Sequence, residues 1–138
     1  MSPEMLTDNN AVKASDLWAL GCILHQMRTG STPFQADSDF QVYSKITKCT
    51  KSTPKTKIEP DLMDLIDKLL QVDPSKRLGA GKPGTHNDYR ALKSHPFFRS
   101  FKWESLKCAS PPIPDEKKIL LTNLLQIKEK RSNQNNLN

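Results

Sequence analysis

The segment from residue 15 to residue 30, SDLWALGCILHQMRTG, constrains the fold of this chain more than any other. On a helix with about 3.6 residues per turn, its apolar side chains point in nearly every direction. These are Leu17, Trp18, Ala19, Leu20, Cys22, Ile23, Leu24 and Met27. A helix that is apolar on all sides is buried in a protein core or in a membrane. The run is about half the roughly 20 residues that span a bilayer, so it predicts a helical domain around one buried central helix.

The two ends of this segment carry helix-boundary residues. Ser15 and Asp16 have side-chain oxygens that accept hydrogen bonds from the free N–H groups of a helix start, so we expect the N-cap there. Arg28 falls in the last turn, and Gly30 follows at the position where helices often end.

The rest of the chain predicts further helices separated by polar loops. Ser2-Pro3-Glu4 opens a short helix, and Phe40 to Ile46 form another that Ser38 or Asp39 caps. Residues 60–70 form an amphipathic helix, Asp88 caps a short helix over 89–94, and residues 116–131 form a last one. Residues 47–57 and 79–88 read as loops. We expect four parts: 1–98, an extended segment 99–115, an amphipathic helix 116–131, and a disordered tail 132–138.

Composition limits the kind of protein. The 138 residues carry a formal net charge of +6, which permits an anionic partner without naming one. Basic residues do not alternate with stacking aromatics on one element, so we expect no nucleic-acid binding. The isolated cysteines Cys22, Cys49 and Cys108 favour a reducing compartment, and none has metal-ligand spacing. The N-terminus shows no signal-peptide pattern and no stretch spans a membrane, so we expect a cytoplasmic protein.

Five short motifs occur in a characteristic order along the chain. They are Ser2-Pro3-Glu4, Asp16-Leu17-Trp18-Ala19-Leu20-Gly21, Gly30-Ser31-Thr32-Pro33-Phe34, Asp73-Pro74-Ser75-Lys76-Arg77-Leu78 and His95-Pro96-Phe97-Phe98. Together they resemble the C-terminal lobe of a eukaryotic Ser/Thr protein kinase. The strings SDLWALGCIL and KRLGAG, with serine before Pro-Glu, are similar to the 3-phosphoinositide-dependent kinases of the AGC group; a calcium/calmodulin-type or other AGC kinase is the alternative.

The resemblance implies an all-α fold, a partial kinase C-lobe with helices F to I around the central F helix, without the N-lobe or the catalytic loop. It implies a buried ion pair between Glu4 and Arg77, whose guanidinium needs a carboxylate partner beside apolar neighbours. Asp16 would cap the F helix and anchor the catalytic loop. Leu17, Trp18, Leu20 and Leu24 would form the core of the helix, with Leu17, Leu20 and Leu24 less covered than in a complete kinase. His25 and His95 are expected to make structural hydrogen bonds.

The motifs that perform phosphoryl transfer are absent from this sequence. It contains no Gly-x-Gly-x-x-Gly, no His-Arg-Asp and no Asp-Phe-Gly. We therefore expect a fragment of a Ser/Thr kinase that is inactive alone, with no catalytic, cofactor-binding or metal-binding residues; Mg-ATP would bind only to an intact parent. The alternative is a stand-alone helical interaction module. Protein substrates or other kinases are the expected partners, and we expect no lipid-binding domain.

Overall fold

The computed structural model describes residues 1–108 together with Lys117, Ile119 and Thr122. All regular structure in this part is helical, and it contains no strand, as predicted. The described residues divide between two units, unit 1 with residues 1–101 and unit 2 with the described part of the chain from residue 102 onward. Unit 1 contains α1 (Pro3–Thr7), α2 (Lys13–Thr29), α3 (Asp39–Thr47), α4 (Pro60–Leu69) and α5 (Tyr89–Lys93), with the 3-10 turns η1 (Pro74–Lys76) and η2 (Pro96–Phe98). Unit 2 contains η3 (Trp103–Ser105).

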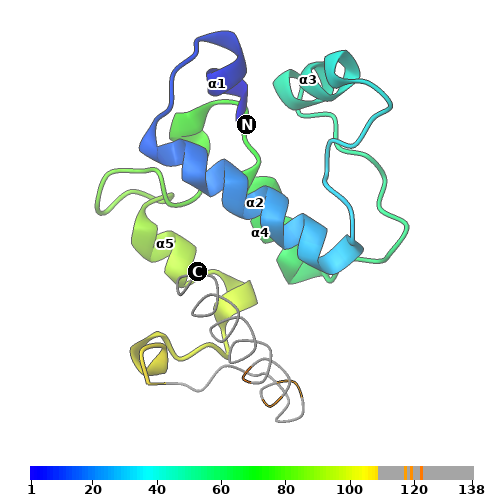
Figure 1. The fold of residues 1–138 in the computed structure, drawn as a ribbon. Coiled ribbons are helices and arrows are strands. Elements are labelled where there is room, and N and C mark those ends of the chain that lie inside the picture. The colour runs from blue at the N-terminus through cyan, green and yellow to red at the C-terminus, as the bar shows by residue number, and fades with distance from the viewer. Residues whose placement is uncertain (109–116, 118, 120–121, 123–138) are drawn as a thin grey trace, which may run out of the picture. The chain divides into compact units, whose positions relative to one another are not determined.

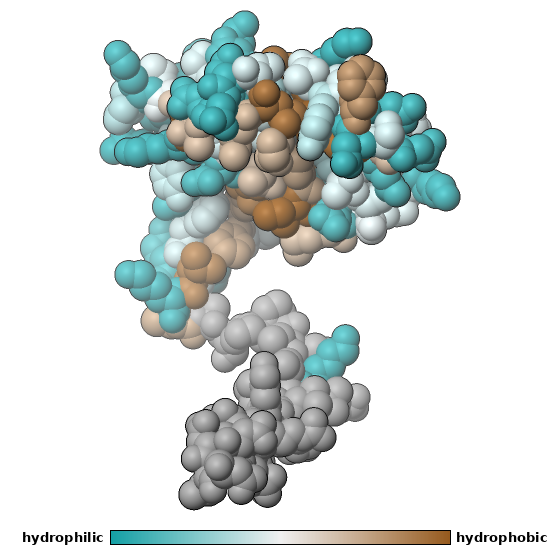
Figure 2. Space-filling model, turned by 45° about the horizontal axis from the view of Figure 1, so that its top comes forward, coloured by the Kyte–Doolittle hydropathy of each residue, from teal (hydrophilic) through white to brown (hydrophobic). Residues whose placement is uncertain are grey.

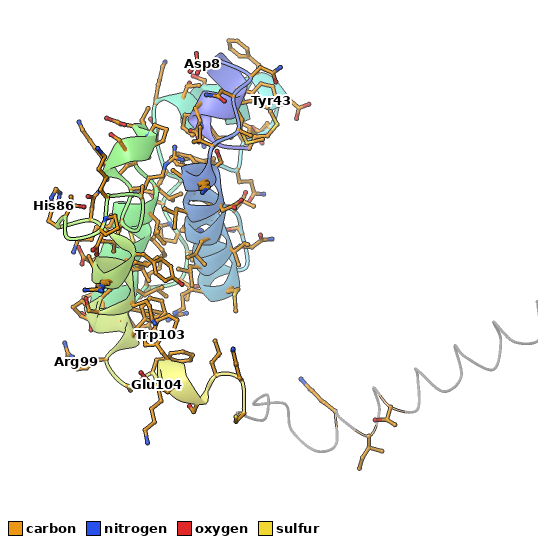
Figure 3. All side chains as sticks on the ribbon, turned by 90° about the vertical axis from the view of Figure 1, so that its left-hand side faces the viewer. Asp8, Tyr43, His86, Arg99, Trp103 and Glu104 are labelled. Atoms are coloured by element: carbon orange, nitrogen blue, oxygen red, sulfur yellow. The ribbon has the colours of Figure 1, made fainter. Side chains whose placement is uncertain are left out.

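The helices α2 and α4 pack side by side and form the centre of unit 1 (Figure 1). Gly21 of α2 makes this close approach tolerable, because a Cβ there would lie 2.9 Å from Leu70 Cδ2. The short helix α1 contacts α3 at one end of the unit, where Figure 3 labels Asp8 and Tyr43. The α2–α4 pair is thus the scaffold on which the other elements are placed.

Two hydrophobic clusters meet on α4, whose side chains divide between them. Trp18 and Phe34 pack face to face in the first cluster, with ring centroids 5.3 Å apart, over Leu62, Ile66 and Leu70. The second cluster consists of Leu65, Leu69, Leu78 and Leu92. The periodic leucines of residues 60–70 therefore predicted a buried face correctly, and α4 supplies the most deeply buried residues of the core.

The expectation that α2 is buried on all sides is wrong. Trp18, Gly21 and His25 are buried, whereas Ile23 is 52% exposed and Met27 is 79% exposed. Leu17, Leu20 and Leu24 are half-buried and pack against the second cluster. The structure covers α2 on the side that faces α4 and leaves the opposite side open, and Figure 2 shows apolar side chains at the surface of unit 1.

The helix boundaries follow their capping residues, with one correction. Gly30 ends α2 in the left-handed conformation (φ 79°), and its N–H donates to Gln26 O at 2.8 Å. Ser38 caps α3 and Asp88 caps α5 through side-chain hydrogen bonds, as predicted. However, α2 begins at Lys13, before the expected caps, so Asp16 lies exposed in its first turn and does not cap it.

One described stretch near the C-terminus differs from the predicted structure. The segment 99–115 was expected to be extended, but residues 103–105 form the turn η3. Residues 109–115, most of the predicted helix 116–131 and the predicted tail 132–138 lie outside the described residues. No described helix has the length and apolar character needed to cross a membrane.

Candidate functional site

Glu4 and Arg77 form a bidentate ion pair across 73 residues of sequence. Arg77 Nη1 lies 2.8 Å from Glu4 Oε1, and Arg77 Nη2 lies 2.7 Å from Glu4 Oε2. The Arg77 side chain is fully buried and that of Glu4 is 8% exposed. Glu4 stands in the first turn of α1 after Pro3, and Arg77 follows η1, so the pair joins the first helix to the turn after α4.

All five N–H groups of Arg77 have an acceptor. Besides Glu4, Nη1 donates to Ala14 O at 2.8 Å, Nε to Gln71 O at 2.9 Å and Nη2 to Val72 O at 3.3 Å. The guanidinium also lies over the Trp18 ring, 5.1 Å from its centroid. A guanidinium removed from water is stable only when its donors are satisfied in this way, so Arg77 fixes three backbone segments relative to one another.

Ser15 connects this pair to the start of α2. Its hydroxyl donates to Glu4 Oε1 at 2.7 Å and accepts from the Val12 N–H at 3.1 Å. The Arg77 guanidinium lowers the pKa of Glu4 to about 2; burial opposes this shift, and the hydroxyls of Ser2 and Ser15 add to it. Ser15 was predicted near the helix start, and it does bond the backbone there. It lies within the first turn of α2, however, and not at the N-cap position.

Asp16 and the open side of α2 form a second surface, which we call the open α2 face and define as Asp16, Ile23 and Met27. The Asp16 carboxylate has no hydrogen-bond or ion-pair partner among the described residues. An acidic side chain in the first turn interacts favourably with the helix dipole, so Asp16 can stabilise the start of α2 although it is not the N-cap residue. Because Ile23 and Met27 lie one helical turn apart, they present adjacent apolar side chains to solvent.

Both predicted structural histidines make hydrogen bonds. His25 Nδ1 lies 2.9 Å from Ser31 O, which fixes the loop after α2. His95 Nε2 lies 2.8 Å from Asp64 Oδ2, and its Nδ1 accepts from the Phe97 N–H at 3.3 Å. The His95 contact ties η2 to α4. His25 Nδ1 also lies 3.2 Å from Thr29 Oγ1, so His25 joins the last turn of α2 to the loop that follows it.

Cys22 and Cys49 do not have the character of reactive nucleophiles. Burial raises the pKa of Cys22 to about 11 and also raises the pKa of Cys49. Cys49 Sγ donates to Leu70 O at 3.0 Å. Within the described residues, no group of three His, Cys, Asp or Glu side chains is arranged to hold a metal ion.

Comparison with known proteins identifies the family. The protein kinase domain family matches residues 1–98 of this chain. The chain belongs to the protein kinase family. It is 45% identical to the 3-phosphoinositide-dependent protein kinase 1 of Rattus norvegicus over 112 residues, which are 81% of this chain and 19% of the rat protein. It is equally identical to the putative 3-phosphoinositide-dependent protein kinase 2 of Homo sapiens over the same share of the chain, and it covers 27% of that protein.

The similarity extends to a more distant organism. The probable serine/threonine-protein kinase pdkA of Dictyostelium discoideum is 39% identical over 124 residues, which are 87% of this chain and 18% of that protein. The chain therefore spans about a fifth to a quarter of the length of these kinases. The motif-based prediction of a Ser/Thr kinase similar to the 3-phosphoinositide-dependent kinases is confirmed.

Sequence reasoning missed several contacts of this kinase segment. Arg28 and Glu59 form an ion pair at the other end of α2, with Nε–Oε2 at 2.8 Å and Nη2–Oε1 at 2.9 Å. Lys51 pairs with Asp67 from the loop before α4. No pattern signals these pairs, because surface charges occur throughout the chain and their partners depend on the tertiary arrangement.

Proposed function

We propose that this chain is the helical C-lobe part of an AGC-type Ser/Thr protein kinase, corresponding to helices F to I of that fold. The parent would transfer the γ-phosphate of ATP to serine or threonine in protein substrates. The motif order, the family match over residues 1–98 and the Glu4–Arg77 pair support this assignment. In it, α2 corresponds to the F helix, and Asp16 and the apolar core of α2 would hold the catalytic parts of the kinase.

The observation that carries this proposal is the open α2 face. Its apolar side chains, Ile23 and Met27, are 52% and 79% exposed, although α2 is the central helix of unit 1. In addition, Trp18 Nε1 is buried and has no acceptor in the described part of the chain. Buried donors normally have a partner, and exposed apolar pairs on a central helix usually mark a contact surface. In this proposal, further kinase polypeptide covers Ile23 and Met27.

We propose that these 138 residues alone neither bind ATP nor catalyse phosphoryl transfer. The sequence lacks the glycine-rich loop that covers the phosphates and the His-Arg-Asp and Asp-Phe-Gly motifs that supply the base and the magnesium ligand. Mg-ATP is thus a cofactor of the assembled kinase only. A cytoplasmic location, and protein substrates or other kinases as partners, follow from the same assignment.

A reconstitution experiment tests this function. The chain is mixed with the portion of human 3-phosphoinositide-dependent protein kinase 1 that precedes the region this chain matches, and binding and Mg-ATP-dependent peptide phosphorylation are measured. We expect no activity from either part and activity from the mixture. Ile23→Asp and Met27→Asp should abolish association, because each places a charge on the contact surface. Val72→Asp is the control, since Val72 is exposed but lies off α2.

The results separate this proposal from that of a stand-alone interaction module. Activity of the 138-residue chain alone contradicts the proposed division of catalytic parts. A chain that melts cooperatively, does not associate with the remaining kinase portion and binds one specific protein through the open α2 face supports the interaction module instead.

A further inference from the structure

Four hydroxyl residues in the chain precede proline: Ser2, Thr32, Thr53 and Ser110. Protein kinases that phosphorylate Ser-Pro or Thr-Pro bind the acceptor residue in extended conformation. Proline favours that conformation in the residue before it, and it brings no N–H that needs a partner. The sequence alone does not distinguish the four positions. The structure describes three of them, and these three differ in burial.

Burial excludes two of these three positions. Ser2 is 1% exposed, so no enzyme reaches its hydroxyl in the folded chain. Thr32 is exposed, but Pro33 is fully buried and Phe34 after it stacks on Trp18. To place Thr32-Pro33 in an active site, the protein would have to withdraw Pro33 and Phe34 from the first hydrophobic cluster. Thr53, by contrast, is exposed and its Pro54 is only half-buried.

Backbone hydrogen bonding distinguishes Thr53 further. Ser52 is firmly held, because its N–H donates to Pro33 O at 2.8 Å and its hydroxyl donates to Gln35 O at 3.1 Å. The next six residues, 53–58, neither donate nor accept a backbone hydrogen bond in the part of the chain that the structure describes. Drawing residues 53–57 into an extended conformation therefore breaks no backbone hydrogen bond, and Ile58 can stay packed against the first hydrophobic cluster.

We propose that Thr53 is a phosphorylation site for a proline-directed Ser/Thr protein kinase acting with Mg-ATP. Thr53 Oγ1 attacks the γ-phosphorus, and the Oγ1–P bond forms as the bond from the γ-phosphorus to the bridging oxygen breaks. ADP leaves, and the hydroxyl proton passes to the carboxylate base of the modifying kinase and then to water. No electron transfer is involved. This inference depends on the loop and is independent of the function proposed above.

The residues around Thr53 determine how a phosphate would change the local charge. Thr53 and Lys55 line a surface hollow together with Ser31, Thr32 and Asp37. Residues 47–58 contain four lysines and no acidic residue. A phosphate of about −2 charge cancels roughly half of this positive charge and places strong acceptors beside Lys55. Phosphorylation would thus change the electrostatic character of this loop while the core stays unchanged.

The test uses the full chain carrying Ser110→Ala, which removes the Ser-Pro site that lies outside the described residues. The protein is incubated with a purified cyclin-dependent kinase and Mg-ATP, and the sites are mapped by peptide mass spectrometry. We expect one phosphoryl group per chain, on Thr53. Thr53→Ala and Pro54→Ala should each abolish incorporation, whereas the controls Thr32→Ala and Thr56→Ala should leave it unchanged. Circular dichroism and thermal melting establish that all variants fold alike.

Two results would overturn this inference. One is phosphorylation of Thr32 at a rate comparable to that of Thr53, since the burial of Pro33 would then offer no protection. The other is a folded chain that takes up no phosphate while a peptide of residues 47–60 is phosphorylated at Thr53, since the loop would then be inaccessible in the protein.

Discussion

Two arginine–carboxylate pairs near opposite ends of α2 share the same two-bond geometry and differ in burial. Arg77 and Glu4 at the start of the helix, and Arg28 and Glu59 at its end, each make two hydrogen bonds of 2.7 to 2.9 Å. The Arg77 and Glu4 side chains are 0% and 8% exposed, whereas those of Arg28 and Glu59 are 33% and 61% exposed. Although the two pairs have the same hydrogen-bond geometry, their different burial predicts very different losses of stability when one partner is removed.

The difference arises from what remains when one partner is lost. An exposed carboxylate without its arginine is solvated by water, so little free energy changes. Glu4 without Arg77 would be a charge held away from water, and Arg77 without Glu4 would keep only carbonyl partners. The buried pair therefore makes the position of α1 and of the segment after α4 depend on each other.

Replacing Arg77 by alanine should give the largest effect. We expect a loss of about 3–5 kcal/mol in the free energy of unfolding, because the substitution leaves a buried unpaired carboxylate and several carbonyl groups without donors. Urea denaturation followed by circular dichroism measures it. The neighbouring variant Lys76→Ala is the control, since the Lys76 side chain is 71% exposed and should have almost no effect. Equal losses in the two variants would show that Arg77 is not buried in solution.

Acid should weaken the fold through Glu4. Its pKa is about 2 in the folded chain and 4.5 ordinarily, so its contribution to stability is complete above pH 4.5 and is lost as the pH falls to 2. The shift corresponds to a loss on the order of 3 kcal/mol. Hydrogen bonding to Ser75, Lys68 and backbone N–H groups also lowers the pKa of Asp73, Asp64 and Asp88, so the wild-type curve contains several contributions.

The variant Glu4→Gln isolates the Glu4 contribution to this pH dependence. Its stability should change less than that of the wild-type chain between pH 4.5 and pH 2, when both are measured by urea denaturation. Parallel curves for the two proteins would contradict the low pKa of Glu4.

Gly21→Ala tests the close packing of α2 against α4, in the part of α2 that lies between the two ion pairs. The new Cβ would lie 2.9 Å from Leu70 Cδ2 and 3.1 Å from Leu69 Cβ, so α2 and α4 would have to move apart. We expect a loss of about 1–3 kcal/mol, measured as a lower midpoint of urea unfolding. The control Gln26→Ala changes an exposed residue of the same helix and should stay within about 0.5 kcal/mol of the wild-type value. A stabilised Gly21→Ala variant would mean that helix propensity outweighs the contact.

Arg28→Ala should give the smallest effect. Glu59 raises the pKa of Arg28, and Arg28 lowers that of Glu59, but both side chains remain in contact with water. We expect a small loss at low ionic strength that disappears in about 1 M salt, where exposed charges are screened. Thermal melting at the two salt concentrations measures it. A large loss that persists in salt would place this pair in the same class as Glu4 and Arg77.

The sequence predicted the α4 face correctly because its leucines repeat at helical spacing and its N-terminal proline marks the start. It also predicted the Gly30 stop and the caps at Ser38 and Asp88, since each depends on one residue and its near neighbours. The burial of α2 was not predictable in this way. Its apolar residues point in all directions, and only the tertiary arrangement determines that Trp18 is covered while Met27 is exposed.

The sequence predicted those residues of the candidate site that belong to a recognisable motif. Glu4 and Arg77 belong to two motifs of the kinase resemblance, although they are far apart in sequence. The start of α2 was misplaced because Lys13 and Ala14 carry no capping signal, whereas Ser15 and Asp16 do. The hydrogen bond from Ser15 to Glu4 joins two elements and has no signature in either.

A double-mutant cycle on the buried pair measures whether its contact couples α1 to the segment after α4. Glu4→Gln, Arg77→Met and the combined variant are compared by urea denaturation with the corresponding three variants of Glu59 and Arg28. We predict that the Glu4 and Arg77 substitutions are strongly non-additive, with a coupling of up to about 3 kcal/mol and a double variant that loses far less than the sum of the single losses. The exposed pair should be close to additive. Additive losses for Glu4 and Arg77 would contradict the claim that their buried contact joins α1 to the segment after α4.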